Sequence, residues 1–165
     1  MDPVSIALKG VGTAYQICRD ICILTNGMKK APTDIERIVK AMQSFCSVLE
    51  NLENVMTAGR QLLLDGVATQ QLDHIAQLVE DNLESLKEMK LVVQDFVTVD
   101  GKAKVSILKK LKWQFAKDNV HHMLQHLKTL KMGLNVALSS LNLYVPVMNA
   151  IFYIDLQNPD SLRCG

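Results

Sequence analysis

The sequence predicts an all-α protein, an up-down bundle of four long amphipathic helices with a short basic helix between the third and the fourth. Apolar residues recur three and four positions apart along most of the 165 residues, aromatic residues make up only 5%, and no strand pattern of any length appears. Short connections imply that consecutive helices are antiparallel neighbours. We expect residues 1–145 to form one helical domain and 146–165 a tail or a short extra element.

The first expected helix, residues 3–25, is the most apolar long segment of the chain. Asp2 is a good N-cap and Pro3 suits the first helical position. Two apolar stripes cover most of its surface: Val4, Leu8, Val11, Tyr15, Cys18 and Cys22, and Ile6, Gly10, Thr13, Ile17, Ile21 and Leu24. A helix that is apolar nearly all round belongs at the centre of a bundle or in lipid.

Four roles compete for this helix. A cleaved signal peptide is disfavoured, because the chain opens with Asp2, Lys9 interrupts the apolar run and no small-residue cleavage site follows. A permanent membrane span is also disfavoured, since Lys9, Arg19 and Asp20 would each cost about 2.5–3.5 kcal/mol at the bilayer centre. There remain a helix buried by the others and a helix that can leave them for a membrane.

Two glycines bear on the choice between a buried helix and a helix that can leave the bundle. Gly10 and Gly12 each cost about 1 kcal/mol of helix propensity relative to alanine. Such a cost implies close packing against a neighbour, or a helix that bends or moves. The candidate residues of a membrane-active or releasable helix are therefore Val4, Ile6, Leu8, Gly10, Val11, Gly12, Ile17 and Ile21.

The second and third helices are expected over residues 34–64 and 70–97. The second follows a capping box, Thr33 to Glu36, and Gly59 is a position where it can bend. Thr69 can cap the third, in which Asn82 falls at a core-like position. The third helix has an acidic outer face made of Asp73, Glu80, Asp81, Glu84, Glu88 and Asp95.

A basic segment precedes the last long helix. We expect a short helix over residues 104–114, a long one over 118–142 and an end near Pro146. The basic residues can form a patch for anionic lipid, with the single tryptophan favouring the membrane interface, or a solvated face that the acidic third helix neutralises. The candidate patch consists of Lys102, Lys104, Lys109, Lys110, Lys112, Trp113 and Lys117.

Catalytic signatures are missing from the sequence. Gly10-Val11-Gly12 lacks the third glycine and the preceding strand of a phosphate-binding loop, and no nucleophile elbow or zinc-protease motif occurs. His122 and His126, like Cys18 and Cys22, have a spacing that can chelate a metal, but a solvated face and an apolar stripe explain them better. We expect a non-enzyme without cofactor or metal.

Charge and cysteine content limit the partners and the compartment. A net charge of +1 gives no general attraction to nucleic acid. The four cysteines lack the spacing of a disulfide framework, which favours a reducing, cytoplasmic location.

Two segments resemble a known family. The opening Met1–Ala7 is similar to the start of fungal N-terminal domains attached to NACHT and other P-loop NTPase receptors of the NLR-like STAND class. Leu111–Phe115 resembles their LKWPF stretch, with Gln114 in place of the usual proline, and Met123–Leu138 resembles their closing helix. The likeness covers about residues 1–142.

The resemblance implies a HeLo-like bundle, akin to the four-helix executioner bundle of necroptosis. Such domains serve in fungal innate immunity, heterokaryon incompatibility and programmed cell death, and several oligomerise and insert an N-terminal helix into a membrane. By position that helix would be Val4–Leu24, although its three charges depart from a deeply inserting segment. Expected partners are copies of the chain or sibling receptor domains, and anionic lipids on activation. The alternative is a protein–protein scaffold whose first helix stays buried.

Overall fold

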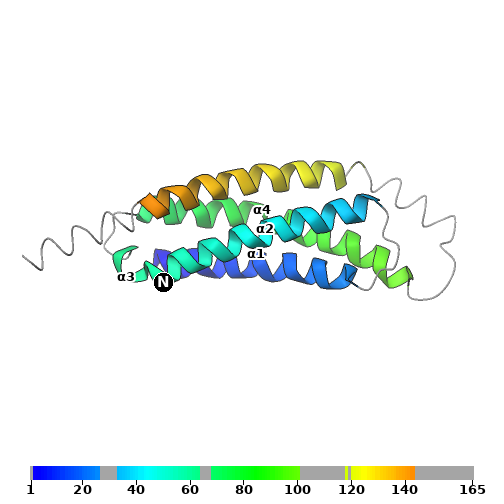
Figure 1. Cartoon of the computed structure of the whole chain (residues 1–165), viewed down its shortest axis with the longest axis horizontal. Coiled ribbons are helices and arrows are strands. Elements are labelled where there is room, and N and C mark those ends of the chain that lie inside the picture. The colour runs from blue at the N-terminus through cyan, green and yellow to red at the C-terminus, as the bar shows by residue number, and fades with distance from the viewer. Residues whose placement is uncertain (1, 27–32, 64–67, 101–117, 119, 144–165) are drawn as a thin grey trace, which may run out of the picture.

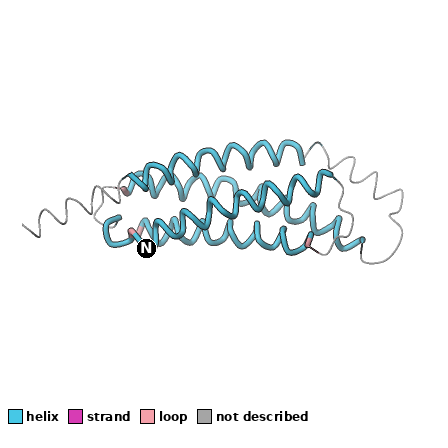
Figure 2. Tube along the Cα trace, in the orientation of Figure 1, coloured by secondary structure: helices cyan, strands magenta, loops and turns pink. Residues whose placement is uncertain are grey.

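The computed structural model describes residues 2–26, 33–63, 68–100, 118 and 120–143, and these are almost entirely helical. The long helices are α1 (Pro3–Thr25), α2 (Thr33–Ala58), α4 (Thr69–Asp100) and residues 120–143; α3 (Arg60–Leu63) is a single turn. No strand occurs in these ranges, as Figure 2 shows. The predicted all-α bundle is confirmed.

The long helices lie side by side, and each runs opposite to the one before it in the sequence, so that the described part of the molecule is an elongated bundle (Figure 1). α1 packs along both α2 and α4. The 120–143 helix lies on the opposite side of the bundle. There Lys131 hydrogen-bonds to Ser44 of α2, and Gly133 lies against Leu78 of α4. Each long helix therefore has two neighbours, and α1 is diagonal to the 120–143 helix.

One expectation about neighbours is wrong. Short connections suggested that each helix lies beside the next, yet α4 follows α2 in sequence and packs beside α1. Gly10 approaches Val79 and Asp20 pairs with Lys90, so α1 and α4 run parallel. The first helix therefore has the second and third long helices as its neighbours.

The core follows one spacing rule in every long helix. Its positions alternate three and four residues apart, the pattern that places side chains between those of a facing helix in coiled coils. In α1 these are Val4, Ala7, Val11, Ala14, Cys18, Ile21 and Thr25. In α2 they are Ile35, Ile38, Met42, Phe45, Leu49, Leu52 and Met56. In the last helix they are Val120, Met123, Leu127, Leu130, Leu134, Ala137 and Leu141.

α4 has the same spacing with one polar member. Its core positions are Leu72, Ile75, Val79, Asn82, Leu86, Met89 and Val93. Asn82 is half-buried, and its Nδ2 donates to the backbone oxygen of Leu78 at 2.8 Å. A hydrogen bond within its own helix lets an amide occupy a core position without a partner on a neighbouring helix.

The predicted 34–64 helix is wrong as a single element, since α2 ends at Ala58 and α3 begins at Arg60. Gly59 still donates its N–H to Val55 at 2.9 Å and accepts from Leu63 at 2.9 Å. The backbone thus keeps helical hydrogen bonds around the interruption, and the bend falls at the expected glycine. α2 and α4 begin one residue before the expected starts, and the expected 104–114 helix and 146–165 tail lie outside the described residues.

Phe45 fills the largest volume among the fully buried side chains, so truncating it tests the core. We predict that Phe45→Ala lowers the free energy of unfolding by about 3–5 kcal/mol, because the bundle cannot close the cavity. Met132→Ala, at a side chain that is 61% exposed, should change it by less than about 0.5 kcal/mol. Urea unfolding followed by circular dichroism measures both. Equal losses in the two variants would contradict the described core.

Candidate functional site

The candidate membrane-active residues of α1 differ in how far their side chains are exposed to solvent. Val4, Val11, Ile17 and Ile21 are buried in the core. Leu8 is half-buried and packs against the core. Ile6 is 44% exposed, so α1 has a solvent-facing side rather than being covered all round.

Small side chains distinguish α1 from its neighbours. Two of its core positions, Ala7 and Ala14, are fully buried and were not anticipated from the sequence, because alanine contributes little to an apolar stripe. The core positions of α2 include Phe45, Leu49 and Met42. Since each buried methylene contributes about 0.8 kcal/mol, α1 contributes less apolar burial of its own than α2 does.

The N-terminal end of α1 is tied to the start of α3. Asp2 accepts from the Ser5 backbone N–H at 2.9 Å and from the Ser5 hydroxyl at 2.7 Å, which confirms the predicted N-cap. Arg60 donates to Ser5 Oγ at 2.8 Å and lies 3.4 Å from Asp2 Oδ2. The Ser5 hydrogen bonds, and secondarily the Arg60 charge, hold the pKa of Asp2 below its usual range.

A second polar contact holds the middle of α1 to α4. Lys90 Nζ donates to Asp20 Oδ2 at 2.7 Å, and Gln16 donates to Asp20 Oδ1 at 2.8 Å. These two bonds, the first above all, lower the pKa of Asp20. Asp20 would therefore lose its partner Lys90 if α1 moved into lipid, whereas Gln16 lies on α1 and would move with it.

The long-range partners of Asp2 and Asp20 were not predicted from the sequence. Arg60 lies 58 residues from Asp2, and Lys90 lies 70 residues from Asp20. No local pattern encodes such pairs, because they depend on which helices become neighbours. Both contacts lie at partly exposed positions, where an ion pair contributes only about 0–1 kcal/mol.

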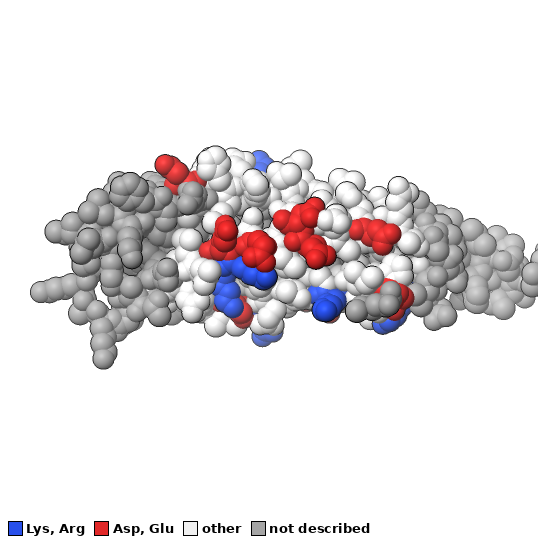
Figure 3. Space-filling view, turned by 180° about the vertical axis from the view of Figure 1, so that it is seen from behind, with Lys and Arg blue, Asp and Glu red and all other residues white. Residues whose placement is uncertain are grey.

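The acidic outer face of the third long helix is present on α4. Its exposed members are Asp73, Glu80, Asp81, Glu84 and Glu88. Figure 3 shows acidic side chains in a row along this side, with Lys87 bonded to Glu84 at 2.6 Å. The side chain of Asp95 and the whole candidate lipid patch, from Lys102 to Lys117, lie outside what the structure describes.

Metal and membrane criteria can be applied to the same residues. Among the described residues, no three histidine, cysteine or acidic side chains are arranged to hold a metal ion. His121 and His122 are exposed, with ring centroids 6.4 Å apart. Within the described ranges, no helix has both the length and the apolar character that crossing a bilayer requires.

Compared with protein-family models, with curated proteins and with solved structures, the chain matches none of them.

The glycines of α1 lie in different surroundings. A Cβ added at Gly10 would lie 3.6 Å from Val79 Cγ1, an ordinary van der Waals contact, whereas one at Gly12 would meet nothing within 4 Å. Gly10 therefore lies beside α4, and packing does not require glycine at either position. The helix-propensity cost remains, and it falls on the one long helix that carries two glycines within the described residues.

Alanine substitutions at the glycines measure their helix-propensity cost. We predict that Gly12→Ala raises the free energy of unfolding by about 1 kcal/mol, since helix propensity improves and no atom has to shift. Gly10→Ala should give a similar gain. Gly133→Ala is the matched control, because its Cβ would lie 3.3 Å from Leu78 Cδ1 and part of the gain is lost to repacking. Urea unfolding ranks the three variants, and a largest gain at Gly133 would contradict this interpretation.

Proposed function

We propose that this protein is a non-catalytic signalling module that acts by self-association and by release of α1 from the bundle toward a membrane. The observation that carries the proposal is the composition of α1. It is a complete bundle helix, yet two of its core positions are alanine, and two glycines reduce its helix propensity.

The proposal rests on α1 because this helix contributes smaller side chains to the core than α2 does. Its release removes few large side chains of its own from the core, and the polar contacts that hold it, Asp2 with Arg60 and Asp20 with Lys90, are partly exposed. Elements that move are drawn from the least stable part of a fold. α1 also exposes apolar side chains at Ile6 and Ile23 before any release, which gives a membrane or a second copy an initial contact.

The resemblance of Met1–Ala7 and Leu111–Phe115 to N-terminal domains of fungal NLR-like receptors gives the proposal its biological setting. In that setting the module takes part in programmed cell death, its partners are copies of itself or sibling receptor domains, and it works in the cytoplasm and at the membrane after activation. The basic segment Lys102–Lys117 would supply contacts to anionic lipid.

A second function is favoured by one specific observation. The three-four spacing of α1 continues without a break from Val4 to Thr25, as expected of a helix that stays in place. In that case the protein is an interaction scaffold, and its partners bind an exposed face of the intact bundle.

Vesicle leakage tests the membrane proposal. Ile6 and Ile23 are 44% and 59% exposed, so the double variant Ile6→Asp/Ile23→Asp should leave the resting bundle folded. In lipid, each aspartate costs up to about 2.5–3.5 kcal/mol at the bilayer centre. With vesicles of phosphatidylcholine and phosphatidylserine, we predict that the variant releases trapped dye at least severalfold more slowly than the unmodified protein.

The matched control is Leu91→Asp/Val136→Asp, at side chains that are 60% and 68% exposed on α4 and on the 120–143 helix. This variant should retain leakage, because neither helix enters the membrane in the proposal. Equal leakage from all three proteins would refute the membrane role, as would equal loss in both variants.

A further inference from the structure

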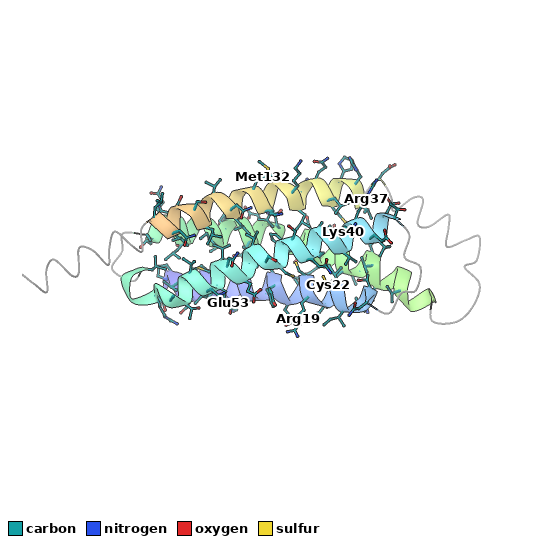
Figure 4. The ribbon with its side chains drawn as sticks, in the orientation of Figure 1. Arg19, Cys22, Arg37, Lys40, Glu53 and Met132 are labelled. Atoms are coloured by element: carbon teal, nitrogen blue, oxygen red, sulfur yellow. The ribbon has the colours of Figure 1, made fainter. Side chains whose placement is uncertain are left out.

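The 120–143 helix has a second seam on its solvent side. Five exposed residues, which we call the outer seam, follow the three-four alternation of the core: Thr129, Met132, Val136, Ser139 and Leu143. Its three apolar members, Met132, Val136 and Leu143, are 61%, 68% and 72% exposed. Figure 4 shows Met132 on the side of the helix that faces away from the bundle. The outer seam thus has the spacing by which helices pack, and it faces solvent in the described part of the chain.

Charge is missing from the second half of this helix. Residues 132–143 contain no lysine, arginine, aspartate or glutamate, and their exposed polar residues are asparagine and serine. Ser47 and Asn51, three and seven residues after Ser44 on the adjoining side of α2, are uncharged as well. The solvent side of a bundle helix is normally rich in charge. A row of exposed apolar side chains in uncharged surroundings is typical of a surface that binds another protein.

Nearer the start of the helix, the α4 side of the outer seam is acidic. Gly133 lies against Leu78 of α4, and the two helices are antiparallel. Asp81 follows Leu78 by one turn and Glu88 follows Asp81 by two turns, so both lie on the side of α4 toward the 120–143 helix. Both side chains are exposed. Counted from the contact between Gly133 and Leu78, the two acids lie level with residues 130 and 123.

The α2 side of the outer seam is basic at the same height. Lys131 hydrogen-bonds to Ser44 of α2, and these two helices run parallel. Lys128 precedes Lys131 by one turn, and Lys40 precedes Ser44 by one turn, which places Lys40 level with residue 127. Both lysines are exposed, and Figure 4 shows Lys40 on α2. The outer seam is therefore bordered by two acids on one side and by two bases on the other.

We propose that the outer seam is a self-association surface, on which a second copy of the chain docks its own outer seam in a parallel, two-fold arrangement. A two-fold axis along the helices places α4 of each copy opposite α2 of the other. Asp81 and Glu88 of one copy then face Lys40 and Lys128 of the other at the same height, and the two uncharged halves meet.

Charge selects this arrangement and this partner. An antiparallel two-fold pairing would place α4 against α4, with Asp81 and Glu88 of the two copies on the same side of the contact. Like charges brought together across an interface oppose binding. An anionic bilayer fits the surface less well than a second copy does, since the same two acids would lie against negatively charged headgroups.

The inference rests on the proposed function only in that it gives self-association a location. Pairing requires neither a membrane nor the release of α1, because α1 is diagonal to the 120–143 helix and stays outside the contact. Release of α1 likewise does not require pairing. The test is therefore made in solution on the resting protein, and vesicle leakage remains a separate measurement.

Sedimentation equilibrium of the full chain under reducing conditions tests the surface. The unmodified protein should form dimers as its concentration rises. Met132→Asp/Val136→Asp brings four carboxylates together in the paired seams and should raise the dissociation constant at least about tenfold. Ile6→Asp/Ile23→Asp makes the same change at exposed side chains of the diagonal helix and should leave the dissociation constant unchanged. Circular dichroism checks that both variants are folded.

Charge reversal tests the parallel arrangement with variants that leave the seam intact. Asp81→Lys/Glu88→Lys makes both borders of the seam basic, and Lys40→Glu/Lys128→Glu makes both acidic. Each variant alone should dimerise at least about fivefold more weakly than the unmodified protein. An equimolar mixture of the two should restore dimers, because basic borders then meet acidic ones.

Each other outcome overturns a stated part of the inference. Undiminished dimers in both charge variants would overturn the parallel arrangement. Dimers that survive Met132→Asp/Val136→Asp would place self-association on another surface, which refutes this inference and leaves the proposed function standing. A chain that stays monomeric at every soluble concentration would refute pairing of the resting protein, while leakage would still decide whether α1 acts on membranes.

Discussion

The shared three-four spacing of buried residues is the constraint on which the rest of the structure depends. It requires each long helix to present one continuous seam to two neighbours, and it fixes which side chains face solvent. The two neighbours of α1 are α2 and α4. Alanine at positions 7 and 14 lets its backbone lie close to both, and it limits how much apolar surface α1 itself contributes.

The small side chains of α1 connect its packing to the proposed function. Two core positions of α1 are alanine, and its polar contacts at Asp2 and Asp20 are partly exposed to water.

The sequence predicted much of the fold, because helix identity depends on local pattern. The N-cap at Asp2, the long periodic segments and the interruption at Gly59 are all local signals, and each appears in the structure. The pairing of α1 with α4 was missed, since the order of helices around a bundle depends on how facing seams fit. For the same reason the contacts Arg60–Asp2 and Lys90–Asp20 could not be foreseen.

The most direct measurement of the central claim is native-state hydrogen exchange, residue by residue, on the reduced protein. If α1 can be released, amides at its core positions, such as Val11 and Ala14, should exchange through an opening of lower free energy than those of Phe45 and Leu49 in α2. If the amides of α1 and α2 all exchange only with global unfolding, α1 is a permanent part of the bundle and its proposed release is wrong.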